Sequence, residues 1–205
     1  MKNQSITEAM LQFIEESPTA FHAAANVEAL LLENGFEKLE NLAEGALVPG
    51  GSYYTMQNGS AVLAVKIPEN PAKGFRIAAS HSDSPCFKIK EVPEMKVENT
   101  YVKLNVEKYG GMILSPWLDR PLSVAGRVFV AGKDEKPEAK LVNLKKDLLI
   151  IPNVAIHFNR EINNGFAYNP QTDMAPLMGL DQELSIKKLC AEAAGVAEEE
   201  ILGSD

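Results

Sequence analysis

The sequence predicts an α/β protein built from two parts, a mixed α/β part followed by a β-rich part. Two amphipathic helical patterns precede three short apolar runs at residues 53–56, 61–67 and 75–80, which read as strands. From residue 101 onward, apolar and polar residues alternate, which is typical of half-buried antiparallel strands. A charged stretch around Pro93 separates the two patterns, and we therefore expect domains at residues 1–92 and 93–205.

The first part is expected to begin with two helices. Ser5 and Glu8 have the spacing of a capping box, and apolar residues follow at helical intervals until Pro18. Thr19 can cap a second helix that ends near residue 35. His22 falls in the first turn of this helix, where the positive end of the helix dipole disfavours a cation. We therefore assign His22 a neutral packing role and leave it out of the site.

A histidine and a carboxylate two positions apart, His81 and Asp83, come directly after the third apolar run. Side chains alternate along a strand, so both can project the same way at the end of a strand over residues 75–80. Ligands of open α/β sheets bind at strand ends. A neutral imidazole can ligate a divalent metal, and a neighbouring carboxylate can fix its tautomer. The spacing alone also fits a solvated turn after a strand.

The second part carries two further groups of polar residues. Asp119 and Arg120 precede Pro121 at a predicted tight turn, and we expect a structural role for them, as a local salt bridge or turn cap. His157 follows an apolar run at residues 148–151, and such a histidine is more often a core or interface residue than a functional one. A last amphipathic helix is expected near residues 186–193.

Composition excludes several classes of function. The formal net charge is -8 and the sequence pI is about 5.0, which disfavours binding to nucleic acid or to an anionic membrane. No apolar run approaches the ~20 residues of a membrane-spanning helix, and the first residues do not resemble a signal peptide. We expect a cytoplasmic protein in which Cys86 and Cys190 are free thiols.

Five motifs, in order along the chain, together resemble one known family. They are residues 17–23 (SPTAFHA), 79–86 (ASHSDSPC), 109–111 (YGG), 117–122 (WLDRPL) and 151–160 (IPNVAIHFNR). This set resembles the aspartyl aminopeptidases, which are cytosolic dizinc exopeptidases. The resemblance covers only the amino-terminal half of such an enzyme. It implies part of a mixed-sheet zinc-exopeptidase domain, followed by an incomplete β-rich dimerisation domain.

The resemblance also implies roles for particular residues. His81 would bind one of two zinc ions, Asp83 would act in catalysis by orienting its ring, and His157 would contact substrate in the active site of a partner subunit. The remaining metal ligands and the general base would come from the second half of the polypeptide. The implied reaction is release of an amino-terminal Asp or Glu from peptides by a homo-oligomer built from dimers. We expect the present chain by itself to have little or no activity, because one ligand cannot position two metals.

Two other interpretations remain open at this stage. The chain could be a non-catalytic dimerisation or assembly module, which would show neither zinc nor hydrolysis of an aspartyl anilide. It could also resemble a related dizinc aminopeptidase or glycyl-peptidase, which fits the segments around Trp117 and His157 less well. Three basic residues could recognise an acidic substrate, and their spacing selects none of them. They are Lys88, Lys90 and Arg160.

Overall fold

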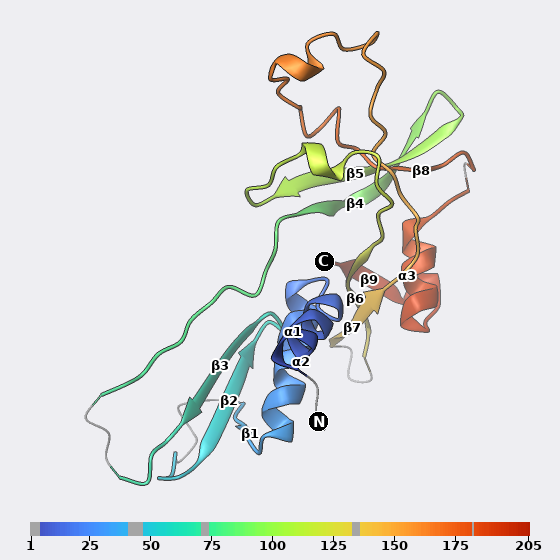
Figure 1. The fold of residues 1–205 in the computed structure, drawn as a ribbon. Helices are drawn as coiled ribbons and strands as arrows, with labels where there is room; N and C mark the ends of the chain where they lie inside the picture. Colours follow the sequence, from blue (N-terminus) through green and yellow to red (C-terminus); the bar gives the residue numbers. More distant parts are fainter. Residues whose placement is uncertain (1–4, 41–46, 71–73, 133–135, 182) are drawn as a thin grey trace. The chain divides into compact units, whose positions relative to one another are not determined.

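The computed structural model describes residues 5–40, 47–70, 74–132, 136–181 and 183–205. It divides into two compact units, Met1–Ser84 and Pro85–Asp205, which are described separately (Figure 1). Among the described helices, none is both long enough and apolar enough to cross a membrane.

The first unit begins with the two predicted helices, α1 (Ile6–Glu15) and α2 (Ala20–Glu33). Ser5 Oγ accepts the Glu8 amide at 3.2 Å and the Glu8 carboxylate accepts the Ser5 amide at 2.9 Å, which confirms the capping box. Thr19 caps α2, and its hydroxyl lies 2.8 Å from Nδ1 of His22. Gly35 follows α2 with φ of 76°, a left-handed conformation that glycine adopts without strain.

A three-stranded sheet follows, in the order β1 (Glu37–Lys38), β2 (Ser52–Gln57) and β3 (Ala61–Lys66). The antiparallel β2 and β3 strands are joined at Asn58 and Gly59, whose φ angles of 52° and 67° suit a tight hairpin turn. Tyr54 of β2 is buried, and its hydroxyl donates to Glu28 of α2 at 2.9 Å. This hydrogen bond and burial fix α2 against the sheet.

The predicted third strand does not form. Residues 75–80 have no strand assignment, and Phe75 and Ile77 are 89% and 86% exposed. Figure 1 shows the segment as an extended trace between β3 and β4, without an arrow. A strand requires a neighbouring strand for its ladder of hydrogen bonds, and in the described sheet β3 pairs only with β2. The apolar pattern of residues 75–80 correctly predicts an extended chain, but its pairing partner is not in the described structure.

The described residues of the second unit form two three-stranded antiparallel sheets and one α-helix. The first sheet has the order β4 (Cys86–Val97), β5 (Tyr101–Tyr109) and β8 (Leu177–Gly179). The second has the order β7 (Pro137–Asn143), β6 (Ala125–Ala131) and β9 (Ile201–Ser204). Helix α3 (Ile186–Ala194) and the short 3-10 helices η1 (Ser115–Trp117), η2 (Ile162–Asn164) and η3 (Glu198–Glu200) complete the unit.

Helix α3 joins the two cores of this unit. Its Ala191 packs in a cluster with Val128 and Val130 of β6, and its Ile186 packs in a second cluster with Leu104 of β5. Cys190 contacts both clusters, and burial raises the pKa of its thiol. Cys86 and Cys190 are both thiols that are not joined in a disulfide.

The division between the units falls earlier than the boundary predicted at residues 92 and 93. That boundary lies inside the long strand β4, which pairs with β5 on both sides of Pro93. The register of the pair shifts between Ile89 and Glu94, so Pro93 occupies an irregular stretch where a missing N–H is tolerated. Charged residues and a proline therefore mark a bulge in a hairpin here and not a linker.

Candidate functional site

His81 and Asp83 meet on the extended segment that follows residues 75–80. His81 Nδ1 lies 2.9 Å from Asp83 Oδ1 and also 2.9 Å from the Asp83 backbone oxygen. Both partners are hydrogen-bond acceptors, so Nδ1 carries the proton. The neutral ring then presents the lone pair of Nε2, and 82% of the His81 side chain is exposed. This tautomer, with a carboxylate on the far nitrogen, is the arrangement that metal-ligating histidines use.

The described residues supply one candidate ligand and not a complete metal site. Hydrolytic zinc takes about three protein ligands and keeps a position for water. Among residues 5–205, apart from the segments outside the description, no group of three or more His, Cys, Asp and Glu side chains could hold a metal ion. His22 is engaged with Thr19 in α2, and His157 belongs to the other unit. The chemistry of the His81 and Asp83 pair fits zinc at one ligand position only.

His157 lies on an exposed turn of the second unit. The Phe158 amide donates to the Ala155 oxygen at 2.9 Å, which makes Ile156 and His157 the two central residues of a turn. Ile156 and His157 are exposed, and Phe158 is 84% exposed. Since His157 is exposed in this unit, its residue type is not explained by packing in the core.

Asp119 and Arg120 have structural contacts, as predicted, but the contact of Asp119 is not local. Asp119 Oδ1 accepts the backbone amide of Asn153 at 2.8 Å, across 34 positions of sequence. Arg120 donates to the Pro116 oxygen at 3.5 Å. Sequence reasoning missed the link to Asn153, because the turn residues around Pro121 carry no signal of a partner so far along the chain.

Two of the basic residues considered for an acidic substrate already have partners. Lys88 Nζ lies 2.9 Å from Asp205, and Lys90 donates to Gln171 at 3.2 Å. The hydrogen bond to Asp205 raises the pKa of Lys88 above its usual value. Burial by itself would raise the pKa of Asp205, but Lys88 and Arg127 outweigh burial and lower it. Lys88 is therefore already paired with a carboxylate within the unit.

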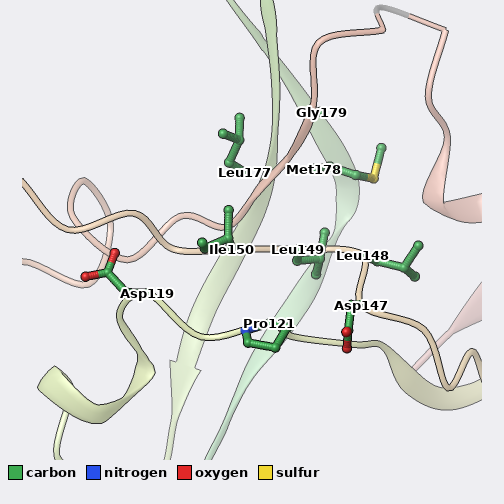
Figure 2. A pocket seen from close by; sticks show the side chains of 9 residues that line it. All are labelled: Asp119, Pro121, Asp147, Leu148, Leu149, Ile150, Leu177, Met178 and Gly179. Atoms are coloured by element: carbon green, nitrogen blue, oxygen red, sulfur yellow. The ribbon is translucent and has the colours of Figure 1, made fainter.

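A shallow pocket of about 370 Å³ is lined in part by Asp119. Figure 2 shows the side chains around it. Its apolar surface comes from two segments, 148–150 and 177–178, and Asp119 and Asp147 lie at different places along its edge. Neither His81 nor His157 lines the pocket. It is a feature of the β-rich unit and contains none of the predicted site residues.

Comparison with known proteins decides the family. Residues 13–205 match the family model described as aminopeptidase I zinc metalloprotease (M18). The chain belongs to the M18 family. This membership confirms the resemblance inferred from the five motifs.

Several M18 relatives match nearly the whole of this chain. A probable M18 family aminopeptidase 2 of Clostridium acetobutylicum is 44% identical over 214 residues, covering 100% of this chain and 49% of the relative. A protein of the same description from Pseudomonas putida (strain GB-1) is 38% identical over 193 residues, covering 92% of this chain and 44% of the relative. The M18 chain therefore spans about half the length of the curated relatives it matches.

Solved structures agree with the fold of this M18 chain. A cryo-EM structure of the Ape4 and Nbr1 complex matches with a TM-score of 0.87 and 31% identity, covering 96% of this chain and 42% of that one. The structure of Chaetomium thermophilum mApe1 matches with a TM-score of 0.84 and 30% identity, covering 97% and 49%. The mApe1 dodecamer of S. cerevisiae, at 22% identity and a TM-score of 0.80, shows the same fold. The predicted α/β class is confirmed.

Proposed function

We propose that this chain is the amino-terminal half of a zinc metallo-aminopeptidase that releases Asp or Glu from the amino termini of peptides. M18 membership supports peptide-bond hydrolysis and zinc. The observation that carries the proposal is the pairing of His81 Nδ1 with Asp83, which leaves Nε2 for a metal. The chemistry that zinc supplies when bound is Lewis-acid activation of water near neutral pH. Two zinc ions in the complete site are part of the proposal.

In this proposal, His81 binds one zinc ion, while Asp83 holds the proton on Nδ1 and fixes the plane of the ring. His157, on its exposed turn, contacts substrate in the active site of a partner subunit. Hydrolysis adds water across the first peptide bond and releases one amino acid and a shortened peptide. Recognition of an acidic residue needs a cation, and Arg160 near His157 is the candidate, because Lys88 is paired with Asp205.

The other metal ligands and the general base belong, in this proposal, to the part of the polypeptide that the relatives have and this chain does not span. The exposed residues 75–80 support this. An extended apolar segment without a neighbour is stable as a strand only when another strand pairs with it. A strand from the second half would complete the sheet next to His81. The present chain alone is therefore expected to have little or no activity.

We further propose a homo-oligomer built from dimers, located in the cytoplasm. The related mApe1 of S. cerevisiae forms a dodecamer, which supports an assembly of this kind. In the present chain, the turn around His157 exposes Val154, Ile156 and Phe158, which suits burial against another subunit.

The second candidate is a non-catalytic assembly module of the same family. The observation that favours it is the incomplete ligand set among the described residues. Such a module would keep the β-rich unit and its interface, and would bind no zinc.

The test compares the complete polypeptide, carrying both halves, with the present chain. Zinc content is measured by elemental analysis, and hydrolysis is measured with aspartyl, glutamyl and leucyl anilides. The proposal expects zinc in the complete protein and a preference for the two acidic anilides. Absence of both zinc and hydrolysis in the complete protein would establish the module instead. Preference for the leucyl anilide would retain the peptidase and reject the acidic specificity.

His81→Ala in the complete protein tests the site itself. Changes to residues that hydrogen-bond to a metal-binding side chain, without touching the metal, lower activity by up to roughly 100-fold. We expect a larger fall in activity for His81→Ala, because it removes the proposed ligand itself. The matched control is His22→Ala, since the His22 ring bonds to Thr19, the residue that caps α2, and is not proposed to bind metal. Full zinc content and activity in His81→Ala would reject this residue as a ligand.

A further inference from the structure

Asp119 lies at the base of the segment that presents His157. Its amide donates to the Ile151 oxygen at 3.0 Å, and Leu118 forms a parallel bridge with Ile151. Ile151 is fully buried. The backbone of Asp119 is thus held against the last buried residue before the exposed segment.

The carboxylate of Asp119 extends this contact one step along the chain. Pro152 has no N–H, so the amide of Asn153 is the first donor after Ile151. Asp119 Oδ1 accepts this amide at 2.8 Å. A hydrogen bond from a backbone amide to an ionised carboxylate is stronger than one to a neutral acceptor. The side chain therefore fixes the point where the segment leaves the core.

From Asn153 the hydrogen bonds continue to the turn. Asn153 Oδ1 accepts the Val154 amide at 2.9 Å, and the Phe158 amide closes the turn on the Ala155 oxygen. His157 is a central residue of that turn. Residues 152–158 are all exposed, so packing within this unit restrains them little. Hydrogen bonds at the base of the segment then decide its direction.

The backbone of Asp119 is itself unusual. Its φ of 55° lies in the left-handed region, which residues other than glycine rarely adopt and which Asp and Asn tolerate best. A left-handed residue whose side chain makes a contact across 34 positions indicates a conformation maintained for that contact.

We propose that Asp119 is a positioning residue for His157. It acts by holding Asn153 and thereby setting where the turn at residues 155–158 points. The role rests on the proposed function of His157 as a substrate contact. Asp119 itself touches neither metal nor substrate in this proposal.

Three substitutions separate the contributions of Asp119. Asp119→Asn keeps an oxygen acceptor and tolerates the left-handed conformation. Asp119→Gly relieves the backbone but removes the acceptor, and Asp119→Ala removes the acceptor and is strained. The control is Asp147→Ala, because Asp147 is the other carboxylate at the edge of the same pocket (Figure 2).

The first measurement is amide hydrogen exchange of the present chain, followed by mass spectrometry. We expect exchange at residues 153–158 to rise by about tenfold or more in Asp119→Gly and Asp119→Ala, with β5 and β6 unchanged. Asp147→Ala should match the parent chain, and Asp119→Asn should show a smaller rise than Asp119→Gly, because its neutral oxygen still accepts the Asn153 amide. Unchanged exchange at residues 153–158 in Asp119→Gly would overturn the proposal. This measurement does not depend on any peptidase activity.

The second measurement is the kinetics of the complete protein on an aspartyl anilide. Asp119→Gly should raise KM with a smaller effect on kcat, and the KM of Asp119→Asn should lie closer to the parent value than that of Asp119→Gly. Asp119→Gly combined with His157→Ala should be no worse than His157→Ala alone, because both changes act through one side chain. Losses that add in the double variant would overturn the positioning role. A complete protein without hydrolysis would reject the proposed function, while exchange would still decide whether Asp119 holds the segment.

Discussion

At the scale of single residues, the hydrogen bond between Asp83 and His81 determines which ring nitrogen can reach a metal. The Asp83 backbone oxygen approaches the same Nδ1 at 2.9 Å, so loss of the carboxylate leaves one acceptor in place. We expect Asp83→Ala to weaken zinc binding by the complete protein by about 10-fold to 100-fold, and Asp83→Asn to weaken it less. Competition titration with a zinc chelator measures the change, with Asp147→Asn as the control. Parental zinc affinity in Asp83→Ala would show that the carboxylate does not support the ligand.

Asp205 gives the second unit a defined dependence on pH. Its pKa is lowered from the ordinary 3.8 because Lys88 and Arg127 outweigh burial. A lowered folded pKa contributes stability above the unfolded pKa, and this contribution is lost as pH falls through the folded pKa. We expect Asp205→Asn to be less stable than the parent chain at pH 7, and the difference to shrink as the pH falls below about 4 toward the lowered folded pKa. Urea unfolding at pH 7 and at pH 3, followed by the fluorescence of Trp117, the single tryptophan, measures the stability difference at each pH. A difference that persists unchanged at pH 3 would contradict this account.

At the scale of elements, helix α3 holds the second unit together because it contributes to both hydrophobic clusters. Glu94 of β4 accepts the Ile186 amide at 2.7 Å, and the Ile186 side chain is buried beside Leu104. We expect Ile186→Ala to lower the free energy of unfolding of this unit by about 2 to 5 kcal/mol, through the lost burial and the cavity left behind. Leu180→Ala, at an exposed position, should change it by less than about 0.5 kcal/mol. Similar urea midpoints for the two variants would argue against α3 as the link.

The same scale shows which elements could be predicted from the sequence. The two helices of the first unit were predictable because Ser5 and Thr19 cap them through residues three positions away. The strand predicted at residues 75–80 does not form, since an apolar pattern is local whereas a strand needs a pairing partner from elsewhere in the chain. Pro93 is misleading because a bulge in a hairpin and a linker share the same composition. For the site, His81 and Asp83 could be paired from their spacing, whereas the contact of Asp119 with Asn153 has no local signal.

At the scale of the whole molecule, the decisive fact is that the chain spans about half the length of its M18 relatives. His81 lies in the first unit and His157 in the second, and each is exposed on its own segment. Neither unit contains a complete set of metal ligands among its described residues. In the function proposed above, the remaining metal ligands come from the part of the relatives that this chain does not span.

The extended segment before His81 provides the test of this assembly. If a strand from the second half pairs with residues 75–80, their amides gain hydrogen bonds that the present chain does not give them. We expect amides of residues 75–80 to exchange rapidly in the present chain, and at least about 100-fold more slowly in the complete protein. Residues 53–56 of β2 are the internal control, because they are paired with β3 in the present chain and should be protected in both. Rapid exchange at residues 75–80 in the complete protein would mean that no strand pairs there, and that His81 is not held at the edge of a completed sheet.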